Sequence, residues 1–294
     1  MSWMHIVILA AVQGLTELLP VSSSAHVIVA AELLHENMST PANALLLVLL
    51  HTGTMFAVVA YFWRRWAEEF LSSWVTFLGF AKRMFAASLL SGLVGYPIIL
   101  LVEHILSQGG RTVAIEALFH KLNWIAPPLA IAGVLIVVAG LREARAPEAA
   151  AAPPRAGARG LAWPAALAMG ALQGLAIPFR GFSRSGSTIS GGLLANGKRA
   201  EIESFSFAMA VAITPLALGR ELWREVAAAH RAGAAVQLGA LLAPGLLGMV
   251  CAFAAGLLAL RWLSRWLEQG RWHWFGLYCL AAAAMVQWLY LRGW

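Results

Sequence analysis

The most regular feature of the chain is a series of long apolar runs separated by short polar connections. Six of these runs contain 18 residues or more, close to the roughly 20 residues that an α-helix needs to cross a bilayer. They cover residues 42–62, 84–107, 124–141, 203–221, 235–260 and 272–291. The pattern therefore predicts six membrane-spanning helices.

Two further apolar runs are shorter, and a proline interrupts each of them. Residues 3–19 would extend only about 25 Å as a helix, less than the hydrocarbon core of about 30 Å. Pro20 ends this helix, and the serines that follow can cap a second half-helix at 23–34. Backbone outside a helix is tolerated at membrane depth only where protein or a wet cavity surrounds it. The break therefore predicts either a re-entrant helix hairpin or a broken membrane helix.

The second half of the chain repeats this arrangement. Residues 161–178 form a short apolar helix broken at Pro178, a polar loop runs from Arg180 to Thr188, and a half-helix continues to about Asn196. A second re-entrant hairpin is expected here.

The predicted fold is an all-α polytopic membrane protein with an inverted-topology repeat. The first repeat covers 1–141, with a hairpin at about 3–34 and three spans. A flexible Ala/Pro/Arg-rich cytoplasmic linker covers 142–160, and the second, inverted repeat covers 161–294 with a hairpin at about 161–196. Three crossings separate the hairpins, so they should enter from opposite faces, as broken helices do in inverted-repeat proteins.

Composition and charge agree with a membrane location. The chain is 60% hydrophobic and 12% charged, whereas soluble domains carry about 25% charged residues. The net charge of +7 fits cytoplasmic loops and anionic lipid better than nucleic acid. Most Lys and Arg residues flank the linker side of the predicted spans. The positive-inside rule places that side in the cytoplasm and both termini on the outer side of the membrane.

One loop on this side is expected to be long. Arg64, Arg65, Glu68 and Glu69 begin a polar connection with an amphipathic piece that continues to Lys82 and Arg83.

The first hairpin concentrates residues that could carry chemistry. Glu17 lies in an apolar helix, where a carboxylate is costly and usually functional. Gln13 is one turn earlier on the same face, so the two could hold a divalent cation, or Glu17 could act as a general base. Ser22 and Ser23 follow the break, and one of the serines here could be an activated nucleophile. His26 could serve as a base or as the nucleophile itself.

The second hairpin has the composition of an oxyanion cradle centred on Arg184. Glycines allow close backbone approach, hydroxyl and backbone N–H groups donate hydrogen bonds, and arginine binds phosphate through two parallel bonds. The candidate phosphate-binding residues here are Gly181, Ser183, Ser185, Gly186 and Thr188, and Ser22 of the first hairpin is expected to join them.

Two other polar residues are assigned less active roles. His51 either lines the cavity or packs against it, with no preference between the two. Glu203 is expected to pair with Lys198 or Arg199.

The two hairpins together resemble the undecaprenyl-pyrophosphate phosphatase family of BacA-type bacterial membrane proteins. That family carries (E/Q)GLTExLPxSSxxH, which matches Gln13 to His26, and PGxSRSGxT, which matches Arg180 to Thr188. A Phe-Ser-Phe follows at Phe205–Phe207.

The resemblance implies an integral membrane phosphatase that converts undecaprenyl pyrophosphate to undecaprenyl phosphate plus phosphate. This activity recycles the lipid carrier for peptidoglycan and is linked to cell shape and bacitracin resistance. It implies a divalent cation, Mg²⁺ or Ca²⁺, held by Glu17 and Gln13, and an active site that opens to the periplasm. Glu17, Ser23, His26 and Arg184 match the catalytic positions. Gln13 replaces the glutamate of many members, and Arg180 replaces a proline, so Arg180 could add a phosphate contact.

Other functions and mechanisms remain open on these residues. A polyprenyl-phosphate transporter or flippase could use the same cradle without hydrolysis. A PAP2-type lipid phosphatase is set aside, because no histidine follows Arg184 before His230. The nucleophile could be Ser23, His26 or a water activated by the metal. The expected partners are an isoprenoid pyrophosphate lipid, the bilayer and a second copy of the chain, with no nucleic acid.

Overall fold

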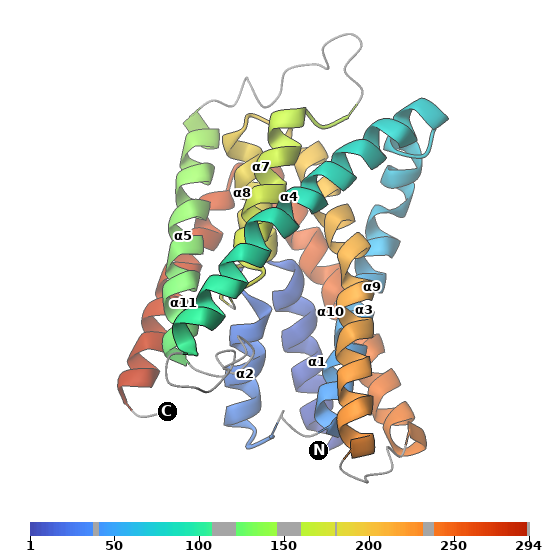
Figure 1. Ribbon diagram of the computed structural model, residues 1–294, viewed down its shortest axis with the longest axis vertical. Helices are drawn as coiled ribbons and strands as arrows, with labels where there is room; N and C mark the ends of the chain where they lie inside the picture. Colours follow the sequence, from blue (N-terminus) through green and yellow to red (C-terminus); the bar gives the residue numbers. More distant parts are fainter. Residues whose placement is uncertain (38–40, 108–121, 146–159, 180, 232–237, 293–294) are drawn as a thin grey trace. The chain divides into compact units, whose positions relative to one another are not determined.

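The computed structural model describes residues 1–37, 41–107, 122–145, 160–179, 181–231 and 238–292. These residues form α-helices and no strands (Figure 1). The helices are α1 (Trp3–Leu18), α2 (Ser23–Leu33), α3 (Pro41–Glu69), α4 (Trp74–Leu106), α5 (Leu122–Arg145), α7 (Trp163–Ala176), α8 (Arg184–Leu194), α9 (Arg199–Arg231), α10 (Leu238–Glu268) and α11 (Trp272–Leu291).

Among the described residues, six helices are long and apolar enough to cross a membrane, namely α3, α4, α5, α9, α10 and α11. Each coincides with one of the six predicted apolar runs, apart from residue 107, which follows the end of α4, and residues 235–237, which lie outside the described residues. The chain is a multi-pass membrane protein. The four remaining helices are short, with 16, 11, 14 and 11 residues. They are the four half-helices that the two broken runs predict.

The long polar connection expected between Arg64 and Arg83 is wrong. α3 continues to Glu69, and α4 begins at Trp74. Ser73 makes this early start possible, because it forms a capping box with Thr76. Arg83 can lie within α4 because its guanidinium finds partners there: it donates a hydrogen bond to the carbonyl of Gly79 at 2.9 Å and lies over the ring of Trp163.

The predicted linker also begins later than expected. Residues 142–145 are the last turn of α5, and residues 146–159 lie outside the described part of the chain. Glu143 in this turn is buried and pairs with Arg199, while Lys198 pairs with Glu201 at 3.9 Å. Glu203 instead accepts a hydrogen bond from Ser264 at 2.5 Å, so its expected pairing with Lys198 or Arg199 is wrong.

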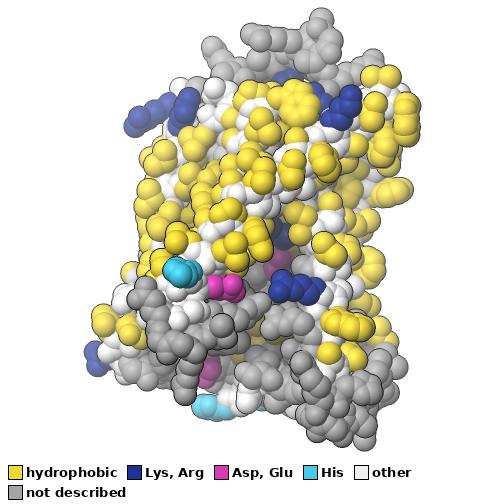
Figure 2. Space-filling view, viewed as in Figure 1, with side chains coloured by type: hydrophobic (Ala, Val, Ile, Leu, Met, Phe, Trp, Pro, Cys, Tyr) yellow, Lys and Arg dark blue, Asp and Glu magenta, His cyan; other side chains and the backbone are white. Residues whose placement is uncertain are grey.

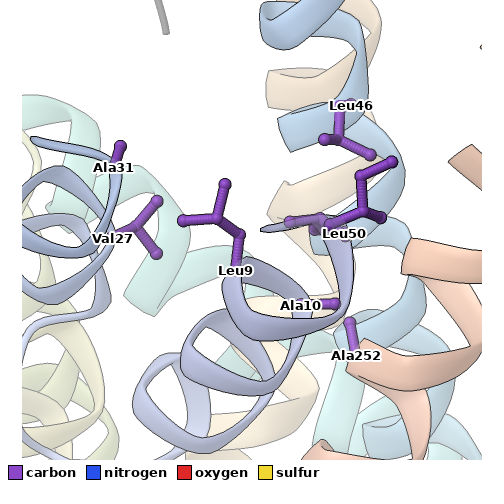
Figure 3. Close-up of a cluster of buried hydrophobic side chains, with 8 residues drawn as sticks. Leu9, Ala10, Val27, Ala31, Leu46, Leu50 and Ala252 are labelled. Carbon is purple, nitrogen blue, oxygen red and sulfur yellow. The ribbon is translucent and has the colours of Figure 1, made fainter. Parts of the chain in front are cut away.

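The chain divides into two compact units, each of which takes segments from both halves of the sequence. Unit 1 contains Met1–Leu19, Ser23–Trp63 and Ala208–Leu263. Its core brings α1, α2, α3 and α10 together, as Figure 3 shows for a cluster of buried aliphatic side chains. The members are Ile6, Leu9, Ala10, Val27, Ala31, Leu46, Leu50 and Ala252.

Glycines let the backbones of unit 1 approach closely. A Cβ atom on Gly53 would lie 2.2 Å from the carbonyl oxygen of Met249, and one on Gly14 would lie 2.6 Å from that of Ala252. Both distances are far below van der Waals contact. α3 and α1 can therefore pack against α10 only with glycine at these positions.

Unit 2 contains Pro20–Ser22, Arg64–Phe207 and Ser264–Trp294. Within it α7 packs on α4, α8 folds back on α7, and α11 runs along α5 (Figure 1). The α5–α11 contact is made at Gly133 and Gly276, where a Cβ on Gly276 would lie 2.6 Å from the carbonyl oxygen of Gly133.

Large apolar side chains remain exposed along α4. Trp74 is 73% exposed, Phe85 70% and Leu93 63%. Figure 2 shows hydrophobic side chains covering much of the visible face. A run of such residues on one helix is expected when the surrounding solvent is lipid.

Candidate active site

The first hairpin turns at a strained position. α1 ends at Leu18, Leu19 is extended, and α2 begins at Ser23. Ser22 adopts a φ of 66°, in the left-handed region that non-glycine residues seldom occupy. Strain of this kind persists where the surroundings impose it, and it is common at functional sites. The turn brings Ser23 back towards the last turn of α1.

Glu17 is the centre of the polar group that results. Its Oε2 atom accepts hydrogen bonds from Ser23 Oγ at 2.5 Å and from Gln13 Nε2 at 3.2 Å. The Nε2 atom of His51, on α3, lies 3.7 Å from the same oxygen. Gln13 is 1% exposed, whereas the side chains of Glu17 and His51 are 16% and 36% exposed. The group is thus held firmly on one side and accessible on the other.

This geometry can generate a nucleophile. A hydroxyl that donates a short hydrogen bond to a carboxylate has a base placed to take its proton. The structure confirms that Gln13, Glu17 and Ser23 lie together. His26 is half-buried on α2, three residues after Ser23. The sequence could not decide between the two predicted roles of His51, because the approach of α3 to α1 is a tertiary contact that local sequence patterns do not predict.

The second hairpin turns at Gly181. Its φ is 100°, and a Cβ atom there would lie 2.4 Å from the carbonyl oxygen of Ile125. Only glycine satisfies both conditions. Ser183 then caps α8, accepting a hydrogen bond from the backbone N–H of Gly186 at 3.2 Å. Arg180 lies outside the described residues.

The loop expected as far as Thr188 is therefore wrong in its extent, since α8 already begins at Arg184. Arg184 is half-buried in the first turn, where the helix macrodipole favours an anion. Ser185 and Gly186 are buried in the same turn. This turn keeps the elements of an anion cradle even though it is helical.

Two hydroxyls of the motif form hydrogen bonds within α8, and one of them also reaches α9. Ser187 and Thr188 both donate to the carbonyl of Arg184, at 3.0 and 2.9 Å. Thr188 Oγ1 also lies 2.6 Å from Ser206 Oγ on α9. Thr188 thereby ties the first turn of α8 to α9, and a direct contact with phosphate stays a prediction.

The tip of the first hairpin, Pro20–Ser22, belongs to unit 2 and lies at this turn. The carbonyl of Pro20 accepts a hydrogen bond from Cys279 Sγ at 3.0 Å. A Cβ atom on Gly186 would lie 3.2 Å from Cβ of Pro20. The tip Pro20–Ser22 and the first turn of α8 therefore pack together within unit 2.

The side chains around Glu17 supply part of the ligand set that a divalent cation needs. No cluster of three or more His, Cys, Asp or Glu side chains is found among the residues that the structure describes. The carboxylate of Glu17 and the hydroxyl of Ser23 nevertheless offer oxygen ligands that Mg²⁺ and Ca²⁺ prefer, while Gln13 presents its Nε2 atom to Glu17. Mg²⁺ commonly takes one or two protein carboxylates and completes its shell with substrate phosphate and water. The residues therefore fit a cation that arrives with a pyrophosphate.

Comparison with known proteins agrees with this chemistry. A family profile described as bacitracin resistance protein BacA matches residues 6–285. Undecaprenyl-diphosphatase 2 of Acinetobacter baylyi is 44% identical over 288 residues, covering 97% of both chains. Undecaprenyl-diphosphatases of Rhodopirellula baltica and Thermus thermophilus are 31% and 29% identical over 294 and 286 residues, covering at least 96% of each chain. Because the profile spans nearly the whole sequence, the chain belongs to the BacA family of bacitracin resistance proteins.

Proposed function

We propose that this chain is an integral membrane phosphatase that hydrolyses undecaprenyl pyrophosphate to undecaprenyl phosphate and phosphate. The observation that carries the proposal is the hydrogen bond of 2.5 Å from Ser23 Oγ to Glu17 Oε2 at a broken membrane helix. A full-length match to undecaprenyl-diphosphatases supports the same substrate. The product is the lipid carrier of cell-wall synthesis.

The first step uses Ser23 as the nucleophile. Its Oγ attacks the terminal phosphorus while its proton passes to Glu17. The bond from that phosphorus to the bridging oxygen breaks, and the bridging oxygen leaves with undecaprenyl phosphate. Glu17 gives up the proton to the leaving group or to solvent, which restores the carboxylate.

The second step releases phosphate from the serine. Water attacks the phosphorus and gives a proton to Glu17. The bond from phosphorus to Oγ breaks, and Glu17 returns the proton to Ser23. Gln13 holds the carboxylate in one orientation through its amide N–H, so the same oxygen faces Ser23 in both steps.

Arg184 and the N-terminal turn of α8 are proposed to hold the pyrophosphate in this reaction. The guanidinium is always charged and suits phosphate oxygens, and a helix N-terminus adds a fixed positive potential. Ser183, Ser185 and Gly186 shape this turn, and Arg180 is proposed as an additional phosphate contact. Phosphoryl transfer is catalysed mainly by positioning and by neutralising charge, which is the role of this group.

A divalent cation, Mg²⁺ or Ca²⁺, is proposed to bind with the substrate at Glu17 and Gln13. When bound, it supplies charge neutralisation on the phosphate oxygens. Glu17 would contribute a carboxylate oxygen, and Gln13 would contribute its amide oxygen once its side-chain amide turns, because Nε2 faces Glu17 in this structure.

The transporter alternative is weaker because of Ser23. A carried phosphate needs a cradle, but it has no use for a hydroxyl held at 2.5 Å from a carboxylate. Purified protein given undecaprenyl pyrophosphate should release phosphate. Ser23→Ala should lower the rate at least about a thousandfold, whereas Ser24→Ala, the matched neighbour on α2, should stay within about threefold.

Acid quenching after a single turnover identifies the nucleophile. Phosphoserine survives acid, whereas phosphohistidine is lost, so a stable phosphoprotein absent from Ser23→Ala identifies Ser23. An acid-labile adduct that disappears in His26→Ala would transfer the role to His26. Full activity of both Ser23→Ala and Glu17→Gln would refute a reaction on this hairpin.

The finer topology is proposed with the function. The two re-entrant hairpins and the two halves, 1–141 and 161–294, form an inverted repeat in the inner membrane, with both termini and the active-site opening in the periplasm. The recurring short-helix pairs α1–α2 and α7–α8, each followed by three long helices, support the repeat. Fusion of alkaline phosphatase to the C-terminus should be active, and fusion of green fluorescent protein should be dark. A homodimer is proposed as the assembly and would be measured by light scattering in detergent.

A further inference from the structure

His51 faces Glu17 in a fixed orientation. Its Nδ1 atom lies 2.8 Å from the carbonyl oxygen of Leu47, one turn earlier on α3. A carbonyl oxygen can only accept a hydrogen bond, so Nδ1 carries the proton in the neutral ring. The Nε2 lone pair is then the atom that points at Glu17 Oε2, 3.7 Å away.

Nε2 of the neutral ring has no hydrogen to offer Glu17 Oε2, which already accepts hydrogen bonds from Ser23 and Gln13, so a cation beside both atoms or a second proton on the ring would make this contact favourable. The separation of 3.7 Å exceeds a direct hydrogen bond, which is about 2.7–3.2 Å long. An ion with ligand bonds of about 2.1 Å to nitrogen and to oxygen can bridge any separation up to about 4.2 Å. The spacing of His51 and Glu17 is within that reach.

The surroundings of His51 resemble those of a metal ligand. Histidines that bind metals usually donate their other ring N–H to a carbonyl or carboxylate, which fixes the ring, and Leu47 supplies that carbonyl here. Gly53, two residues after His51, lies against the backbone of Met249 and so fixes this part of α3 against α10. The ring is 36% exposed, so an ion can reach it.

We propose that His51 is a ligand of the divalent cation, opposite Glu17, and that it shifts the site's preference towards Co²⁺ and Zn²⁺. The proposal rests on the phosphatase function above and names a residue that the motifs do not contain. Imidazole favours these borderline metals, whereas sites made only of oxygen favour Mg²⁺ and Ca²⁺. A neutral imidazole also adds a metal ligand that carries no charge, at a site where Gln13 provides an amide in place of a carboxylate.

Titration calorimetry of the purified protein with the metal ion alone tests this directly. His51→Gln keeps a polar side chain but removes the imidazole, and Co²⁺ affinity should fall at least about tenfold, while Mg²⁺ affinity changes less than about threefold. His5→Gln is the matched control. His5 Nδ1 lies 2.7 Å from Glu36 Oε1, so this variant removes a second imidazole–carboxylate pair of unit 1 that lies outside the site.

A measurement on the unaltered chain avoids dependence on the variant's folding. In protein labelled with ¹⁵N-histidine, Zn²⁺ should shift the Nε2 resonance that is absent from His51→Gln. Equal Co²⁺ affinities for wild type, His51→Gln and His5→Gln would overturn the proposal, as would an unshifted His51 resonance. Phosphate release in that case would leave the phosphatase function standing and identify His51⁺ as an ion-pair partner of Glu17 only.

Discussion

Replacing Gln13 with glutamate should make the folded protein depend on a divalent cation. Gln13 Nε2 lies 3.2 Å from Glu17 Oε2, so Gln13→Glu places a second carboxylate where an N–H donor now stands. Two unit charges at this distance repel by about 5 kcal/mol at an effective dielectric constant of about 20. This value is an upper limit, because uptake of a proton or of a cation relieves it.

Thermal unfolding in detergent, with a chelator and then with Mg²⁺ or Ca²⁺, measures the effect. Gln13→Glu should unfold several degrees below wild type in the chelator, since each 1 kcal/mol corresponds to about 2–4 °C in a domain of 150–250 residues. Added cation should restore most of the loss and should bind more tightly than to wild type, because a second carboxylate raises the charge of the site.

Gln173→Glu is the matched control for this experiment. Gln173 is equally buried, and its Nε2 atom donates to Ser91 Oγ at 3.2 Å. A carboxylate there should destabilise the protein equally with and without cation, because the side chain it would face is the hydroxyl of Ser91. If Gln13→Glu also unfolds at one temperature in chelator and in cation, the reasoning that places a metal at Glu17 is refuted.

Two further outcomes follow from the packing of unit 2. Gly181→Ala should reduce phosphate release at least about tenfold, because its Cβ would meet the carbonyl of Ile125 at 2.4 Å and displace the start of α8. Gly160→Ala is the control: φ is 97° there but no atom lies within 4 Å, so activity should stay near that of wild type. Equal losses of activity in the two variants would argue against the steric cause. Arg199→Gln should destabilise the protein by about 3–5 kcal/mol, because it leaves the buried carboxylate of Glu143 without the guanidinium that pairs with it. The double variant with Glu143→Gln should recover part of this loss in thermal unfolding. Additive losses would show that the two residues do not act as a pair.

Much of the architecture could be predicted from hydropathy because the bilayer imposes a length on every span. The six long helices and the two broken runs follow from that constraint. The pairing of Gln13 with Glu17 was also predictable, since residues four apart share a helix face. Ser23 could be placed nearby because the proline break leaves few residues for the turn.

Other features depend on contacts that a local pattern does not contain. The approach of His51 to Glu17 requires α3 to pack against its neighbours in unit 1, and Gly53 contributes to that packing through Met249. The start of α4 was missed because the pattern gave more weight to the charges of Lys82 and Arg83 than to the cap at Ser73. Charged side chains with long apolar stems can lie along a membrane helix when their ends find a carbonyl or an aromatic ring.

The two Gln-Gly-Leu stretches show how one local geometry can carry two roles. Gly14 and Gly174 both let a short helix approach the backbone of a long one, at Ala252 and at Ser91. The preceding glutamines then differ in what they meet: Gln13 donates to Glu17, while Gln173 donates to Ser91. The residue four positions after the glutamine decides this difference. It is Glu17 in the first stretch and Ile177 in the second, so of these two stretches the first alone sets a carboxylate one helical turn after its glutamine.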